Sequence, residues 1–164
     1  MQNFKNYTDY MTSPLGVIKI KASKYGITGI EFTSQKKLPS LGCSLTEQCI
    51  VELAEYFAGR RKIFNLPLDH KGTDFQNSVW SALQDIIFSE TISYGVVASM
   101  AGKPAAVRAA GTALKKNPIA IIVPCHRVIG KNGTLTGYSG GLERKSWLLA
   151  HEAYYKNQLS LGNN

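Results

Sequence analysis

Two apolar runs separated by a short polar turn predict a β-hairpin over residues 15–33. The apolar positions are Val17, Ile18 and Ile20 in the first run and Ile27, Ile30 and Phe32 in the second. Between them, Lys24-Tyr25-Gly26 supplies the residues of a turn. A further apolar run over 63–68, interrupted by Pro67, predicts another strand of the same small sheet.

A helical period follows the hairpin. Apolar residues recur at the spacing i, i+3, i+4, i+7 and predict an amphipathic helix over 45–58. These positions are Ile50, Leu53, Ala54 and Phe57. Ser44 and Glu47 have the spacing of a capping box at its start, and Gly59 is suited to end it.

The second half of the chain is mostly helical in pattern. Thr73 and Gln76 form a second capping box before a broad apolar stripe over 74–88. Ser93 is placed to cap a helix over 94–101, and Pro104 to occupy the first position of a helix over 105–116. Helix, short turn, helix is the helix-turn-helix pattern. Residues 142–155 predict a last helix.

The apolar run over 119–123 predicts a buried strand that Pro124 ends. Cys125, His126 and Arg127 follow directly. A neighbouring cation or base can bring the reactive thiolate of a cysteine into the neutral pH range. The alternative is an inert buried cysteine, which is the commoner fate of this residue.

These elements predict an α+β fold of two domains. Residues 1–72 would form a small α/β domain in which we find no chemistry. Residues 73–164 would form a mostly helical domain with the helix-turn-helix, of the winged-helix-like kind, and would carry Cys125.

Charge and cysteine usage narrow the function further. The net charge is +8, and no Asp or Glu occurs from Thr91 to Leu142, which suits a surface that meets phosphates. A solvated basic face without function is the alternative. Three cysteines without a CxxC pair favour a reducing, cytoplasmic compartment, and their spacing fits no metal site. No apolar run is long enough for a membrane span, and the N-terminus lacks a signal sequence.

The helix predicted over 105–116 is nearly bare of long side chains, apart from Arg108. A helix that reads base edges in the major groove carries polar side chains there. A slim helix with one long cation suits close approach to the minor groove instead. Tight packing between helices is the alternative, because small residues serve it equally well.

Several motifs, in matching order and spacing over residues 73–155, resemble those of the O6-alkylguanine-DNA alkyltransferases. They are Ile-Ser-Tyr at 92–94, Ala-Gly-Lys-Pro at 101–104, Arg-Ala-Ala-Gly at 108–111, Asn-Pro at 117–118, Pro-Cys-His-Arg-Val at 124–128, Gly-Tyr-Ser-Gly-Gly-Leu at 137–142 and Leu-Leu-Ala-His-Glu at 148–152. The resemblance implies a ribonuclease H-like first domain. Ala110 departs from the larger aliphatic residue that is usual in the family, and residues 1–72 show no zinc ligands of the kind some members carry.

The resemblance also implies a function and roles. The chain is expected to repair duplex DNA containing O6-alkylguanine, as a monomer and without cofactor or metal, by moving the alkyl group irreversibly to Cys125. His126 and Glu152 would activate the thiol, and Tyr94 would help to rotate the nucleotide and protonate the leaving guanine. The residues expected to bind DNA or the flipped base are Lys103, Arg108, Asn117, Val128, Lys131, Tyr138, Ser139 and Gly140.

Rival functions remain at this point. Alkyltransferase-like lesion sensors lack the acceptor cysteine that this chain has at Cys125. A helix-turn-helix regulator would need a helix that reads sequence, which 105–116 is not, and a cysteine hydrolase is a more distant alternative. On general grounds Glu152 would be a solvated helix charge.

Overall fold

The computed structural model describes residues 5–35 and 38–159. Its contacts form two compact units. One reaches from the N-terminal part of the chain to His70 and takes up the chain again at Asn157, and the other is Lys71–Lys156. The predicted domain limits, 1–72 and 73–164, stay a prediction, because a contact unit and a domain need not end at the same residue.

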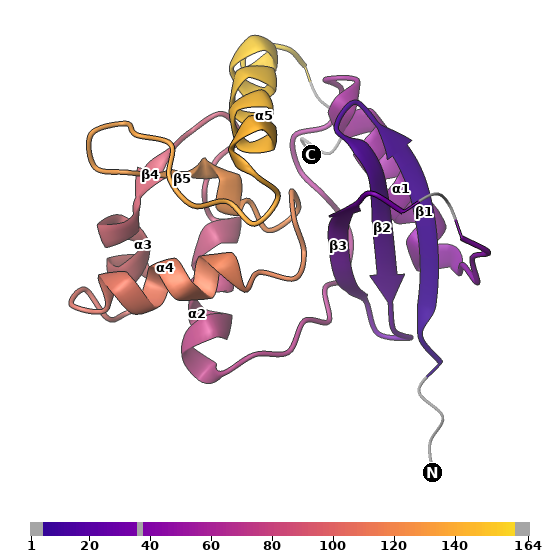
Figure 1. Cartoon of the computed structure of the whole chain (residues 1–164), viewed down its shortest axis with the longest axis horizontal. Helices are drawn as coiled ribbons and strands as arrows, with labels where there is room; N and C mark the ends of the chain where they lie inside the picture. The colour runs from indigo at the N-terminus through magenta and orange to yellow at the C-terminus, as the bar shows by residue number, and fades with distance from the viewer. Residues whose placement is uncertain (1–4, 36–37, 160–164) are drawn as a thin grey trace. The chain divides into compact units, whose positions relative to one another are not determined.

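The first unit contains a three-stranded antiparallel sheet of order β1-β2-β3 (Figure 1). Its strands are β1 (Tyr7–Ser13), β2 (Gly16–Ala22) and β3 (Ile27–Thr33). The predicted hairpin is β2 and β3, in which Ile18 lies opposite Phe32 and Ile20 opposite Ile30. Strand β1 was missed, because aromatic and polar residues are mixed along both of its faces.

Helix α1 (Ser44–Phe57) packs against this sheet and confirms the predicted helix. Its capping box differs from the predicted Ser44 and Glu47 pair: the Thr46 hydroxyl accepts from the backbone N–H of Cys43, 2.8 Å away. The buried stripe is also rotated from the predicted one. It consists of Cys49, Leu53 and Tyr56, while Ala54 is exposed.

The strand predicted over 63–68 is wrong. Only Leu68 pairs, in one isolated parallel bridge to Ile27. Pro67 has no N–H to donate, although its carbonyl accepts from the backbone N–H of Ile27 at 2.8 Å. The preceding chain is held by a side chain, since the Glu52 carboxylate accepts from the backbone N–H of Asn65.

The second unit begins with α2 (Asp74–Gln84), and the predicted box of Thr73 and Gln76 is confirmed. The helix ends at Gln84, four residues before the predicted end. Ile86 is buried in the core and Ile87 is 72% exposed, so the apolar residues continue beyond the end of the helix. The indole of Trp80 donates to the carbonyl oxygen of Ala113 at 2.9 Å and joins α2 to the helix-turn-helix.

The helix-turn-helix consists of α3 (Tyr94–Met100) and α4 (Val107–Lys115), which pack together. Ser93 caps α3 as predicted. Pro104 does not begin α4, because residues 103–106 complete a turn first. Both proposals for the small residues of α4 have support: Ala110 and Ala113 are buried in packing, while Arg108 and Ala109 stay exposed.

Two short strands and a last helix complete this unit. Strand β4 (Ile92–Ser93) pairs in parallel with β5 (Val128–Ile129), and α5 (Leu142–Tyr155) agrees with the predicted helix. Between β5 and α5 the chain turns at residues 130–133, and no strand follows that turn. The α+β class predicted from the sequence is confirmed.

Candidate active site

The segment before Cys125 is a buried series of turns, so the strand predicted over 119–123 is wrong. Ile121 has φ 71, a left-handed conformation that is rare for a β-branched residue. The N–H of Ile122 donates to the carbonyl of Ala120, and that of Cys125 to the carbonyl of Val123, both at 2.8 Å. An apolar run of five residues fits a buried turn as well as a buried strand, and pattern alone cannot choose between them.

The buried side chain of Asn117 holds these turns together. Its Nδ2 donates to the carbonyl of Val123 at 2.9 Å, and its Oδ1 accepts from the N–H of Ile119 at 3.0 Å. The same Nδ2 lies 3.2 Å from Sγ of Cys125 and donates to it. Asn117 therefore fixes the backbone that carries the thiol and also contacts the sulfur.

Cys125–Arg127 form one turn of 3-10 helix. The turn directs His126 and Arg127 to Glu152 of α5, which is completely buried. His126 Nε2 lies 2.7 Å from Oε1 of Glu152, and Arg127 donates from Nε at 2.8 Å and from Nη2 at 2.9 Å. The backbone N–H of Ser89 is a further donor, at 3.1 Å. Glu152 is thus not the solvated helix charge that general expectation favours.

The charge states of this cluster depend on burial and on the contacts among its ionisable side chains. Burial opposes ionisation of Glu152, but His126 and Arg127 outweigh it and hold the pKa of the carboxyl well below its usual range. Burial lowers the pKa of His126 more than Glu152 raises it, and the charge of Arg127 adds to the lowering. Both effects favour the neutral form of His126, in which the imidazole can act as a base.

The contact with Glu152 also assigns the tautomer of His126. An ionised carboxylate only accepts hydrogen bonds, so Nε2 carries the hydrogen. Nδ1 is then the basic nitrogen, and within the described part of the chain it is buried without a hydrogen-bond partner. This arrangement of a base oriented by a carboxylate, one residue from a thiol, is the logic of an activated nucleophile.

Burial dominates the pKa of Cys125, and two side chains together with the backbone N–H groups of Cys125 and His126 oppose it. The thiol is 7% exposed, and desolvation raises its pKa. The hydrogen bond from Asn117 and the positive charge of Lys145 act in the opposite direction. Lys145 was missed from the sequence, although its spacing from Leu148 and Glu152, i, i+3, i+7, places all three on one helix face.

Tyr94 and Tyr138 lie at the edge of this cluster. The Tyr94 hydroxyl, at the start of α3, donates to the carbonyl of Thr136 at 2.8 Å. The Tyr138 hydroxyl is buried and, among the residues described, has no hydrogen-bond partner. Burial, with a smaller effect of Cys125, raises the pKa of Tyr138 well above its usual range, so this phenol stays neutral.

The other predicted site residues divide into pocket and surface positions. Val128 is fully buried, with its carbonyl turned to Lys145, and the carbonyl of Gly140 accepts from Arg144. The exposed positions are Lys103, Arg108, Lys131 and Ser139. Lys103 lies 5.4 Å from the centre of the Phe75 ring. Of the expected catalytic residues, the structure joins His126 and Glu152 by a direct contact, and it leaves the expected DNA-binding cations accessible.

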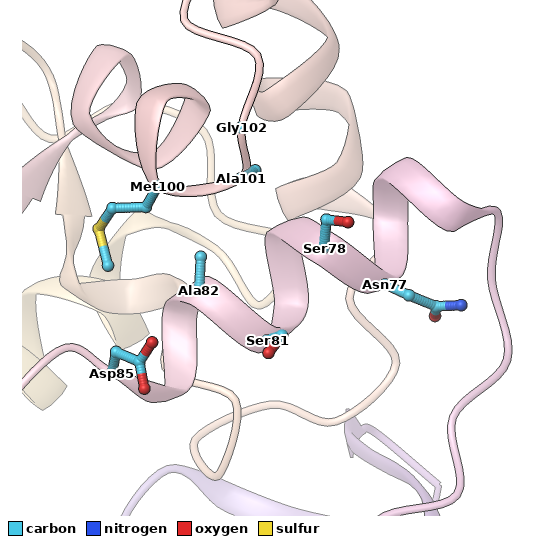
Figure 2. A pocket seen from close by; sticks show the side chains of 8 residues that line it. All are labelled: Asn77, Ser78, Ser81, Ala82, Asp85, Met100, Ala101 and Gly102. Carbon is cyan, nitrogen blue, oxygen red and sulfur yellow. The ribbon is translucent and has the colours of Figure 1, made fainter.

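A separate open hollow lies between α2 and the end of α3, where Figure 2 shows Ala82 directed toward Met100 and Ala101. Asp85 is the single ionisable side chain of its lining. The hollow holds no thiol or imidazole, so it offers none of the groups that the buried cluster combines.

The described residues offer neither a metal site nor a membrane span. No group of three or more His, Cys, Asp or Glu side chains is arranged to hold a metal ion. No helix within the described ranges has the length and apolar character that spanning a membrane requires.

Two family comparisons match the chain. Residues 6–70 match "6-O-methylguanine DNA methyltransferase, ribonuclease-like domain", and residues 74–154 match "6-O-methylguanine DNA methyltransferase, DNA binding domain". Similar proteins are named methylated-DNA–protein-cysteine methyltransferase. That of Methanosarcina barkeri is 43% identical over 152 residues, which cover 89% of this chain and 96% of the relative. An inducible one from Bacillus subtilis is 41% identical over 165 residues, which cover 96% and 91%.

Solved structures agree with these matches. The O6-methylguanine methyltransferase of Mycobacterium tuberculosis superposes with a TM-score of 0.83 at 40% identity, covering 92% of this chain and 94% of that one. A structure from the same organism in complex with DNA gives a TM-score of 0.80 at 42% identity, with 89% and 92% covered.

Proposed function

The chain belongs to the 6-O-methylguanine DNA methyltransferase family, and we propose that it repairs O6-alkylguanine in duplex DNA by moving the alkyl group to its own Cys125. The observation that carries this assignment is the buried Cys125 thiol, hydrogen-bonded by Asn117 and followed by the oriented pair of His126 and Glu152. This is the geometry of a prepared nucleophile.

The transfer is a displacement at carbon. The thiol proton passes to Nδ1 of His126, directly or through one water. The Sγ–C bond then forms while the C–O6 bond breaks, and the guanine anion that leaves takes a proton from the Tyr94 hydroxyl. The proton held by His126 returns to Tyr94 through solvent, so the reaction adds an alkyl group to Cys125 and leaves guanine in DNA.

The damaged base must leave the helix to reach this thiol, because O6 is inaccessible inside the stack. Arg108, which is exposed on α4, would fill the space left in the duplex. Lys103 and Lys131 supply further exposed charge for phosphates. The base itself would be bound by the backbone of Val128, Ser139 and Gly140 and by the side chain of Tyr138, with Asn117 supporting the turns behind it. The chain needs no second copy for this and acts as a monomer.

The reaction is expected to occur once per chain. A thioether is a very poor leaving group at neutral pH, and the other two thiols, Cys43 and Cys49, lie in the other unit. Burial and the nearby Glu52 raise the pKa of Cys49 to about 12, so it stays protonated.

Mass spectrometry after reaction with excess methylated duplex tests this proposal. One added methyl group on the peptide containing Cys125 is expected, in a burst equal to the protein concentration, with no effect of S-adenosylmethionine. Cys125→Ser should accept no methyl group and still retard the duplex in a gel-shift assay. Turnover beyond one methyl per chain, or label on Cys43, would contradict the proposal. A parallel duplex with O4-methylthymine defines the substrate range.

A further inference from the structure

We infer that Lys145 is a positioning residue of the transfer reaction. Its buried ammonium group has the Cys125 thiolate as its counter-ion, and it also holds the loop to which Tyr94 is bound. The inference rests on the proposed function for its role in transfer. It adds a residue of α5 to the site, beside Glu152.

The ammonium group of Lys145 lies in an unusual position. The side chain is completely buried, and Nζ donates to the carbonyls of Val128 at 2.6 Å and Thr136 at 2.9 Å. Within the described ranges, no carboxylate forms an ion pair with it. A buried ammonium without a counter-ion is costly, so a nearby group that can become an anion gains stability from it.

The thiol of Cys125 is the group near Lys145 that can become this anion, because the other ionisable groups of the site are paired or remain neutral. The carboxylate of Glu152 is already engaged by Arg127 and His126. Burial favours the neutral form of His126, and a phenol is a weaker acid than a thiol, so Cys125 ionises before Tyr138.

Cys125 and Lys145 influence each other directly. Burial raises the pKa of Cys125 and lowers that of Lys145, and the electrostatic attraction between the two groups opposes both shifts. Another cation, Arg144, donates a hydrogen bond to the carbonyl of Gly140. Lys145 therefore supplies a positive charge that favours the thiolate form of Cys125.

Lys145 also connects the thiol to the group that protonates the leaving base. The carbonyl of Thr136 accepts from both Lys145 Nζ and the Tyr94 hydroxyl. Loss of Lys145 would leave the carbonyl of Val128 unpaired on one side and loosen the acceptor of Tyr94 on the other. One side chain thus fixes the backbone of the base pocket and the start of α3.

Three variants test the inference: Lys145→Met, which keeps the length and removes the charge, Lys145→Arg, which keeps the charge, and Lys156→Met. Lys156 is half-exposed near the end of the same helix and pairs with Glu90 outside the site, so its variant controls for the loss of one cation. The first readout is the rate of iodoacetamide alkylation at Cys125 against pH, resolved by peptide so that Cys43 does not contribute. The second is the methyl-transfer rate, and the third is the melting temperature.

Lys145→Met should raise the pH midpoint of Cys125 alkylation by about one to two units. The fraction of Cys125 present as thiolate at pH 7 then falls by about tenfold to a hundredfold. The transfer rate at pH 7 should fall by a similar factor and recover at high pH. Lys145→Arg should keep the midpoint even if its melting temperature drops, and Lys156→Met should change neither. An unchanged midpoint in a folded Lys145→Met protein would overturn the inference, whatever its transfer rate.

The wild-type protein supplies a measurement that requires no variant to fold. NMR titration of the Lys145 side chain before and after methylation of Cys125 should show a lower pKa in the methylated form, because a thioether cannot serve as a counter-ion. Iodoacetamide can cap Cys125 for the same comparison if no methyl is transferred. An identical titration in both forms would refute the coupling, while absence of methyl transfer by the wild type would refute only the proposed function.

Discussion

Replacing Glu152 by Gln should strongly destabilise the second unit. The carboxylate receives four contacts, from His126, twice from Arg127 and from the N–H of Ser89. In the variant, Gln keeps one acceptor oxygen, but its amide N–H groups face the donors that the second carboxylate oxygen accepted from. Arg127 meanwhile remains charged and buried without its anionic partner. Breaking a buried ion pair by removing one partner costs about 3–5 kcal/mol. For a unit of this size, about 4–8 °C of melting temperature accompany each kcal/mol, so a fall of at least about 12 °C is expected.

Denaturant and thermal unfolding measure this loss, with Glu143→Gln as the matched control. Glu143 is exposed in the first turn of the same helix, so its variant should stay within about 0.5 kcal/mol of the wild type. The double variant Arg127→Met with Glu152→Gln should be more stable than the sum of the two single effects by at least about 1 kcal/mol, because it leaves no buried charge unpaired. A loss below about 1 kcal/mol for Glu152→Gln would refute the buried cluster.

The pH dependence of stability separates the contributions of His126 and Glu152. The folded pKa of His126 is lowered, so the unfolded chain binds its proton first and stability falls as pH drops below about 6.5. The folded pKa of Glu152 is also depressed, so its contribution is present above about 4.3 and is lost as pH falls further. Wild-type melting temperature should therefore decline in both windows, and Glu152→Gln should lose the acidic one.

Three further substitutions test the site. Asn117→Ala should destabilise the fold by about 1–3 kcal/mol in urea unfolding, because it leaves the buried N–H of Ile119 unpaired and removes one of the two donors to the carbonyl of Val123. It should also raise the alkylation midpoint of Cys125, and a normal midpoint would refute its contact with sulfur. Arg108→Ala should slow repair more opposite a well-paired base than opposite an abasic position, since a weakly held base needs less help to leave the stack. Equal slowing in single-turnover assays would indicate plain phosphate contact. Tyr94→Phe should slow methyl transfer with iodoacetamide alkylation of Cys125 unchanged, and a change in both would indicate a structural role.

Local signals predicted the parts of the fold that depend on neighbouring residues. The Thr73 and Gln76 box and the Ser93 cap both form as expected, because each cap needs only residues within one turn. The end of α2 was misplaced, since Ile86 is buried by contacts from outside its own helix. Long-range burial sets that boundary, and the helical period cannot show it.

The sequence predicted which residues form the candidate site better than it predicted their charge states. Family motifs led to Cys125, His126 and Glu152, and the structure brings these three together. The charge states were not accessible from spacing, because Arg127 and burial decide them jointly. Lys145 was overlooked since a lysine in a helix is usually exposed, and its two carbonyl partners belong to other segments.

The dependence of the thiol on α5 has a consequence for protein synthesis. Glu152 follows His126 by 26 residues, and Lys145 also comes from the helix that the ribosome makes after the nucleophile. At about 5–20 residues per second, Cys125 spends about one to five seconds without these partners. During that interval it is an ordinary thiol in an unassembled site, with neither an oriented base nor a neighbouring ammonium. Until α5 packs against the site, Cys125 of a growing chain therefore reacts with alkylating agents no faster than other cellular thiols do. Its single methyl acceptor is thus not used up early.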